Sequence, residues 1–310
     1  MSTAPDMTVE LAGIRLRNPV LAASGTFGYG LEWAALLDLN TLGGFVTKGL
    51  SREPMPGNPP PRLAVVPADL SQAMGQLGQL GMLNSIGLQN VGVDAFIREK
   101  LPKLAKLDTA VIANVFGYEI DDYVEVVRRL DDADGLAAYE LNLSCPNTSQ
   151  GGMTFGVDAQ LTASVVAAVK RISRRPVFAK LSPNVPSRPN GDDIVSIARA
   201  AEQAGADALT LVNTVLARQS PDAPPTARIP AGGGGLSGPA IYEVALRMVR
   251  AAAGAVKIPI IGLGGVICGA DAAEFLAAGA TAVQVGTANF YDPLAVPRIA
   301  RELEQLRREA

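Results

Sequence analysis

Eight short apolar runs, each followed by a stretch of helical periodicity, constrain the fold of this 310-residue chain more than any other feature. The runs are apolar throughout instead of alternating, which is typical of strands buried on both faces of a parallel sheet. We expect strands at 20–24, 44–48, 110–115, 138–144, 177–181, 208–213, 258–263 and 282–286. Eight such strands with intervening helices close most economically into a (β/α)8 TIM barrel, and a doubly wound open sheet is the alternative.

The stretches between the runs complete this α/β prediction. We expect helices at 31–37, 93–104, 120–130, 159–172, 192–204, 239–253, 270–278 and 293–306. No shift in composition divides the chain, so the sequence predicts one barrel domain over 1–310, with inserted loops at its C-terminal face. The opening segment 8–16 predicts a β-hairpin that turns at Ala12-Gly13 and covers the N-terminal mouth of the barrel.

Composition excludes several classes of protein. A net charge of −3 argues against a nucleic-acid surface. The start of the chain has no basic and apolar runs like those of a signal peptide, and no apolar stretch approaches the roughly 20 residues of a membrane span, so we expect a cytoplasmic protein. The chain has no histidine, which removes Ser-His-Asp triads and histidine metal sites. Its two cysteines, Cys145 and Cys268, cannot supply the roughly four thiolates of an iron–sulfur cluster, and we expect no metal site.

Polar or glycine residues close every one of the eight strand candidates. Barrel enzymes carry their chemistry at the C-terminal ends of the strands, where these residues would meet. In chain order the ends are Ser24-Gly25, Lys48-Gly49, Asn114, Asn142 with Cys145, Lys180, Asn213-Thr214, Gly264-Gly265 and Gly286-Thr287. Eight such ends converging on one rim predict an active site there.

The segment 142–147, Asn-Leu-Ser-Cys-Pro-Asn, places a thiol between two carboxamides at a strand end. Asparagine offers both donors and acceptors, which suits a flat heterocycle with carbonyl and N–H edges. A thiol that solvent can reach acts as a base or nucleophile, although most free cysteines are small buried apolar residues. The flanking Asn142 and Asn147 favour the functional interpretation for Cys145, whereas we interpret Cys268 as a packing residue.

Two glycine sites follow the seventh and eighth strands, where barrels commonly bind a phosphate through backbone N–H groups. Gly264-Gly265 and Gly286-Thr287 fit that use, and the alternative is that they relieve crowding where strand meets helix. The match of 233–238 to G-x-G-x-x-G follows a proline-rich loop instead of a strand, so it does not indicate a Rossmann fold. Ser237-Gly238-Pro239 instead predicts the start of a helix.

Lys48 and Lys180 each end an apolar strand, which places their charge inside the rim. One would pair with a substrate carboxylate, and the other with an electron-rich ring that gains negative charge on reduction. Ion pairs with buried carboxylates are the less expected alternative, because the other strand ends carry few acidic residues.

Seven motifs, in order along almost the whole chain, resemble those of dihydroorotate dehydrogenases, the FMN-dependent enzymes of pyrimidine synthesis. They are the segments 47–49, 57–62, 84–90, 142–147, 212–214, 235–239 and 286–290. A cysteine in the base position is similar to class 1, and 86–90 and 287–290 resemble class 1B. The resemblance implies that NAD accepts the electrons through a second subunit that carries FAD and a [2Fe-2S] cluster.

The resemblance also implies a mechanism, in which Cys145 removes a proton from C5 of dihydroorotate while C6 delivers hydride to flavin N5. The implied substrate residues are Lys48, Asn84, Ser85, Ile86, Gly87, Leu88, Asn142, Asn147, Asn213 and Thr214. The implied FMN contacts are Ser24, Lys48, Gly49, Asn114, Asn142, Lys180, Val212, Gly238, Gly264, Gly265, Gly286 and Thr287. A homodimer joined to the FAD and iron–sulfur subunit, as a heterotetramer, is the implied assembly.

The segment 69–81 departs from the family pattern because it is longer than the usual link before the Asn84 motif. Three other functions remain open at this point. They are a class 1A homodimer that uses fumarate, a different FMN barrel such as a dihydropyrimidine or enoate reductase, and a non-catalytic flavin-binding electron-transfer subunit. The different FMN barrel should not carry this set of asparagines, and turnover of dihydroorotate with an artificial acceptor would discriminate the non-catalytic subunit.

Overall fold

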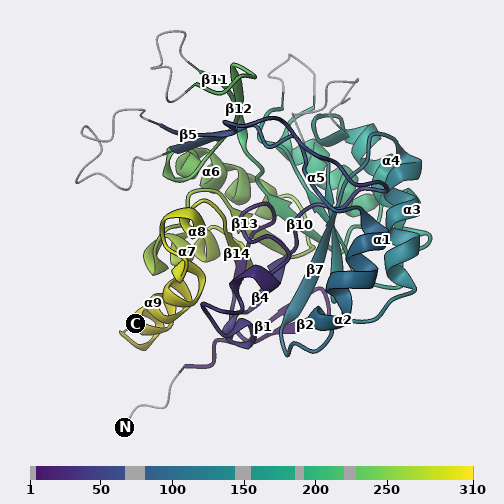
Figure 1. Ribbon diagram of the computed structural model, residues 1–310. Helices are drawn as coiled ribbons and strands as arrows, with labels where there is room; N and C mark the ends of the chain where they lie inside the picture. Colours follow the sequence, from purple (N-terminus) through teal and green to yellow (C-terminus); the bar gives the residue numbers. More distant parts are fainter. Residues whose placement is uncertain (1–4, 67–80, 144–154, 186–191, 220–227, 310) are drawn as a thin grey trace.

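A computed structural model describes residues 5–66, 81–143, 155–185, 192–219 and 228–309 (Figure 1). Eight parallel strands close a barrel in the chain order β3, β4, β7, β8, β9, β10, β13, β14. Their bounds are Val20–Ala22, Gly44–Val46, Ala110–Val115, Ala138–Asn142, Val177–Lys180, Ala208–Leu211, Ile260–Leu263 and Ala282–Val285. Each lies within an expected strand, so the barrel prediction is confirmed and the open sheet is wrong. β13 starts late because Pro259 has no N–H to donate to a neighbouring strand.

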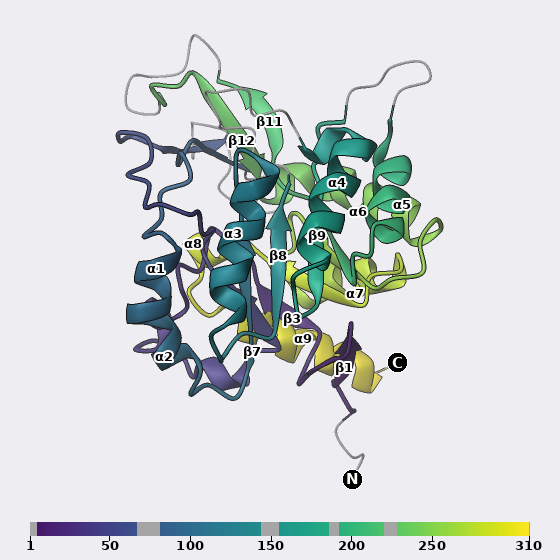
Figure 2. The same ribbon diagram turned by 90° about the vertical axis from the view of Figure 1, so that its right-hand side faces the viewer.

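Helices cover the outside of the barrel (Figure 2). The long ones are α3 (Ile120–Asp131), α4 (Ala159–Lys170), α5 (Ile194–Gln203), α6 (Tyr242–Ala253), α7 (Gly269–Ala277) and α9 (Ala295–Glu309). Before β7, the short segments α1 (Val93–Ala95), η4 (Phe96–Lys100) and α2 (Leu101–Leu104) follow one another directly. Within the described ranges, no helix is both long and apolar enough to cross a bilayer.

The helix expected at 31–37 is wrong, because only the short 3-10 turn η1 (Leu31–Trp33) forms there. Trp33 turns inward and stacks on Phe27 with ring centroids 4.9 Å apart, whereas the side chain of Leu36 is 61% exposed. The apolar residues therefore do not share one buried face. Without such a face, nothing compensates the entropy lost in forming so short a helix.

The N-terminal hairpin is confirmed as β1 (Val9–Leu11) and β2 (Ile14–Leu16), and it covers the N-terminal mouth as expected. Its turn residues Ala12 and Gly13 have φ angles of 51° and 81°. Leu11 and Leu16 are fully buried and pack on an apolar layer inside the barrel, to which every barrel strand contributes one residue. The layer consists of Leu21, Val46, Ile112, Ala138, Phe178, Ala208, Ile261 and Ala282.

A polar layer lies directly above this apolar layer. Side chains two residues apart on a strand point to the same side, and two residues beyond the apolar layer the chain carries mainly polar groups. These are Lys48, Asn114, Glu140, Lys180, Thr210 and Gln284. The barrel interior therefore changes from a hydrocarbon plug to a polar floor within one side-chain layer.

A four-stranded antiparallel sheet stands over the C-terminal end of the barrel (Figure 1), where the sequence predicted only loops. Its order is β11 (Val215–Arg218), β12 (Gly233–Ser237), β6 (Gly81–Asn84) and β5 (Leu63–Val66). The glycines of β12 permit close approach of backbone and side chain. A Cβ on Gly234 would lie 1.9 Å from the Asn84 carbonyl oxygen, and one on Gly235 would lie 2.1 Å from Thr214 Oγ1. The G-x-G-x-x-G match is thus a strand in this sheet and not a dinucleotide-binding turn.

Candidate active site

A cavity opens at the C-terminal mouth of the barrel, with about 1260 Å³ of space when open solvent at its entrance is included. Residues at or just beyond the ends of all eight barrel strands line it. Those expected from the sequence are Ser24, Lys48, Gly49, Asn84, Ile86, Gly87, Leu88, Asn114, Asn142, Lys180, Val212, Asn213, Thr214, Gly238, Gly264, Gly265, Gly286 and Thr287.

Three expected residues are not among those lining the cavity. Ser85 is buried behind the wall, where its hydroxyl oxygen accepts a hydrogen bond of 2.9 Å from Asn58 Nδ2. Its hydroxyl group thus has a structural partner, and its expected contact with substrate stays a prediction. Cys145 and Asn147 lie outside the described residues, as does most of the 69–81 segment, so their assignments stay predictions.

Three asparagines converge on the cavity from different elements. Asn213 Nδ2 donates to Asn142 Oδ1 at 3.3 Å, and Asn213 Oδ1 accepts from the backbone N–H of Thr214 at 2.8 Å. Asn84 Nδ2 donates to the Gly235 carbonyl at 2.9 Å across the antiparallel sheet. These bonds fix the direction of each carboxamide. The result is a set of polar edges suited to a ring that bears carbonyl and N–H groups.

Lys180 lies in the floor of the cavity and is paired with a buried carboxylate. Its side chain is 5% exposed, and its Nζ lies 3.3 Å from Oε1 of Glu140, which is fully buried. The sequence argument treated an ion pair with a buried carboxylate as the less expected alternative. For Lys180 that expectation is wrong. It counted acidic residues only at strand ends, whereas Glu140 lies within β8 and points into the barrel.

Lys48 differs from Lys180 because it has no ion pair within the described part of the chain. Burial lowers the pKa of Lys48, the positive charge of Arg62 lowers it further, and the negative charge of Glu32 opposes the change. A partly buried cation without a counterion is favourably placed for an anionic ligand.

The glycine loops after β13 and β14 border one side of the cavity. Gly265 has φ 82°, and a Cβ there would lie 2.8 Å from the Cβ of Tyr242, so close packing does require glycine. Among the described residues, no hydrogen-bond acceptor lies within reach of the backbone N–H groups of Gly265 and Val266. Thr287, which precedes the short helix α8 (Ala288–Tyr291), donates from Oγ1 to Ser237 Oγ at 2.8 Å. The two interpretations of the glycines, packing and anion binding, are therefore compatible.

Several lining residues were missed by the sequence argument. Leu63 and Met82 belong to the unexpected antiparallel sheet, and Phe116 follows a strand end without a recognisable motif. Phe290 lies in the 286–290 motif but was not assigned to the site. The spacing along the chain could have revealed Phe116, because it lies two residues beyond Asn114. Cys268 lies at the N-terminus of α7, where burial raises the pKa of its thiol, as suits a packing residue.

Comparison with known proteins points to one enzyme family. The dihydroorotate dehydrogenase family model matches residues 6–306. A protein of Solibacter usitatus named "Putative dihydroorotate dehydrogenase A (fumarate)" is 58% identical over 96% of this chain and 92% of its own length. Proteins of Citrifermentans bemidjiense and Geobacter sp. strain M21 are each 52% identical over 97% of this chain and 93% of their own length. Both are named "Dihydroorotate dehydrogenase B (NAD(+)), catalytic subunit". With its closed barrel and its ring of asparagines and lysines, the chain belongs to the dihydroorotate dehydrogenase family.

Proposed function

We propose that this chain oxidises (S)-dihydroorotate to orotate in pyrimidine biosynthesis, with FMN as the immediate electron acceptor. The observation that carries the proposal is the convergence of Asn84, Asn142 and Asn213 on a cavity that also holds Lys48, which has no ion pair among the described residues. Dihydroorotate is a small anionic ring with carbonyl and N–H edges. Carboxamides match those edges, and a lysine matches the carboxylate.

The residues of the cavity fit a flavin mononucleotide. The buried Oδ1 of Asn114 has no hydrogen-bond donor among the described residues, and a flavin ring presents an N–H group that can supply one. The N–H groups of Gly265 and Val266 are available to a phosphate, and the single glycine cradle favours FMN over the larger FAD. FMN supplies a two-electron acceptor for the substrate hydride. Lys180, which lines the cavity, would supply a positive charge to the ring when the ring gains negative charge on reduction.

We assign the proton transfer to Cys145. In the sequence, the residue follows Asn142, the last residue of β8, by three positions. With no histidine in the chain, a thiolate is the general base that the motif offers. Asn142 and Asn213 would hold the substrate ring in register with that base.

We further propose that electrons leave through a partner subunit that carries FAD and a [2Fe-2S] cluster and reduces NAD, with two catalytic chains in the complex. The names of the Citrifermentans and Geobacter relatives support this, and so does a chain with two cysteines, too few for its own cluster. A fumarate-reducing homodimer is the second candidate, favoured by the name of the Solibacter relative.

The purified chain tests these proposals directly. We expect a yellow protein that releases FMN and not FAD, and that reduces dyes with dihydroorotate but reduces NAD poorly. Adding the FAD and iron–sulfur partner should restore NAD reduction in a complex containing both chains. A colourless protein that fails to bind added FMN would refute the flavin assignment, and efficient reduction of fumarate would move the chain to the second candidate.

A further inference from the structure

Glu140 gathers four side chains from four other strands beneath the cavity. Its Oε1 accepts hydrogen bonds from Asn114 Nδ2 at 2.8 Å and from Lys180 Nζ at 3.3 Å. Its Oε2 accepts from Thr210 Oγ1 and Gln284 Nε2, both at 2.9 Å. The donors belong to β7, β9, β10 and β14, and Glu140 itself lies on β8. It is fully buried and does not line the cavity.

A carboxylate that only accepts hydrogen bonds fixes the orientation of its neighbours. Asn114 must turn its NH2 group toward Glu140, so its carbonyl oxygen points elsewhere, and this buried oxygen has no donor within the described residues. Lys180 is likewise held at one end by the carboxylate. Asn114 and Lys180 both line the cavity, whereas Thr210 and Gln284 do not. One oxygen of Glu140 thus orients the two groups that meet a ligand.

Stability alone does not account for a buried charge at this position. Buried ion pairs can often be replaced by well-packed apolar residues with no loss of stability, because desolvation offsets much of their attraction. The layer immediately below shows that this barrel can be filled with apolar side chains. The polar cluster around Glu140 is therefore better explained by the two side chains, Asn114 and Lys180, that it holds at the cavity.

We propose that Glu140 is a positioning residue that holds the Lys180 ammonium and the Asn114 carbonyl oxygen against the flavin, and thereby sets the flavin's reduction potential. This inference rests on the proposed function. A cation held at the ring stabilises the negative charge that the ring gains on reduction, and its effect falls with distance. Glu140 touches neither ring nor substrate, so it acts through Lys180 and Asn114.

Replacing Glu140 by glutamine tests the proposal. The variant removes the charge and turns an NH2 group toward two of the four donors, so Lys180 and Asn114 lose their common anchor. We expect the midpoint potential of bound FMN to fall by about 30 mV or more, which for two electrons is a tenfold weaker preference for the reduced form. The rate of flavin reduction should fall about tenfold, while the KM for dihydroorotate should change little.

A double-mutant cycle separates positioning from direct electrostatics. Lys180→Gln should lower the potential by itself, and adding Glu140→Gln should lower it by less than in the wild-type background, because only the route through Asn114 remains. If Glu140→Gln raises the potential, or if its full effect persists in the Lys180→Gln background, Glu140 acts through its own charge and the proposal is wrong. Should Glu140→Gln fail to fold, Glu140→Asp keeps the charge but withdraws it by one methylene, and should also lower the potential.

Asp131→Asn is the matched control, since it makes the same chemical change at the opposite end of the barrel. It should leave the potential of the folded protein unchanged. A wild-type chain that binds no FMN would defeat the proposed function itself. A wild-type chain that binds FMN and turns over, with a Glu140→Gln variant of unchanged potential, would defeat only the role given to Glu140.

Discussion

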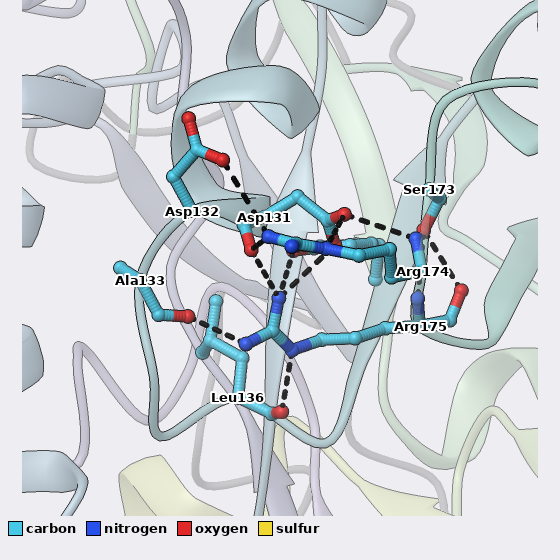
Figure 3. Close-up of polar contacts among 8 residues, drawn as sticks. Asp131, Asp132, Ala133, Leu136, Ser173, Arg174 and Arg175 are labelled. Carbon is cyan, nitrogen blue, oxygen red and sulfur yellow. Dashed lines mark hydrogen bonds and ion pairs between the residues drawn. The ribbon is translucent and has the colours of Figure 1, made fainter.

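Two buried carboxylates, nine positions apart in the chain, organise opposite ends of the barrel. Asp131, at the end of α3, lies at the N-terminal rim, where Oδ1 accepts from Tyr139 OH at 2.9 Å and from Arg175 Nη1 at 3.0 Å. Its Oδ2 accepts from both the backbone N–H and the Nε of Arg174, each at 3.0 Å (Figure 3). Glu140 lies inside the barrel, and its network leaves the Asn114 carbonyl oxygen without a donor in the part of the chain that the structure describes.

The two hydrogen-bond networks differ in whether they leave a buried polar group of the described residues without a partner. Arg175 also donates to the Leu136 carbonyl at 3.0 Å, so the cluster at the N-terminal rim is satisfied within the protein and joins α3 to the start of β9. Tyr139 and Glu140 are neighbours on β8, yet their side chains serve these separate networks, because successive residues of a strand face opposite sides. The polar groups around Asp131 are paired within the protein, which indicates a structural role. The Glu140 network instead leaves the carbonyl oxygen of Asn114, which lines the cavity, without a donor among the described residues, which fits a ligand there.

The largest effect should come from Cys145→Ala at the catalytic end. Turnover of dihydroorotate should fall by roughly 10²–10⁴, the usual contribution of a general base, while bound FMN and the melting temperature stay unchanged. Steady-state assays with a dye acceptor, absorbance spectra and thermal melts measure all three. Cys145→Ser should retain slow activity. Full activity in the alanine variant would remove Cys145 from the mechanism and weaken the division between the two ends.

Asp131→Asn should give the reverse result, a loss of about 2–3 kcal/mol in the free energy of unfolding without loss of turnover per folded molecule. Burial tends to raise the pKa of Asp131, but hydrogen bonds from Arg174, Tyr139 and Arg175 outweigh it and hold the pKa below its usual range.

Because the pKa of Asp131 is lowered in the folded protein, the stability that Asp131 contributes should depend on pH. The wild-type carboxylate contributes stability above the unfolded-state pKa of about 3.9, and the contribution disappears as the pH falls through the lowered folded-state value. The stability difference between wild type and Asp131→Asn should therefore narrow in acid, as urea titrations at several pH values would show. A difference that stays constant down to strongly acidic pH would contradict this origin.

A pH titration of Lys48 tests whether a lysine with no ion pair among the described residues behaves differently from Lys180, which is paired with Glu140. Because burial lowers the pKa of Lys48, its ammonium loses its proton below the usual lysine range as the pH rises. Orotate affinity should then weaken about tenfold on the alkaline side, beginning below the ordinary pKa of about 10.4. Spectral titration of the flavin with orotate measures this loss. Lys48→Arg should move it to higher pH, and an identical profile in that variant would assign the titration to another group.

The smallest effect should come from Tyr139→Phe, which removes one neutral donor from Asp131 and one acceptor from Arg175. A loss of about 1 kcal/mol in unfolding free energy is expected, with unchanged flavin reduction. Denaturant unfolding and rapid mixing on the same preparation would measure both. A change in flavin reduction here would show that the two faces of β8 communicate and that the separation between the ends is incomplete.

The sequence predicted the barrel and most of the cavity wall because both depend on local patterns. Apolar runs mark the strands, and the residue that closes each run reaches the rim. Glu140 escaped notice because two of its partners, Thr210 and Gln284, lie 70 and 144 residues away. The antiparallel sheet was missed because β12 is glycine-rich and β5 lacks a regular apolar alternation. The helix at 31–37 had the right periodicity but no surface to bury it.

The hairpin over the N-terminal mouth has a consequence for engineering thermal tolerance in this protein. Leu11 and Leu16 seal an apolar layer that the polar floor separates from the cavity. Stabilising substitutions often cost activity when they rigidify a reactive centre, but repacking beneath this hairpin touches no group that meets substrate. Directed selection for heat resistance should accumulate substitutions there first, and the enzyme should keep its turnover as its working temperature rises.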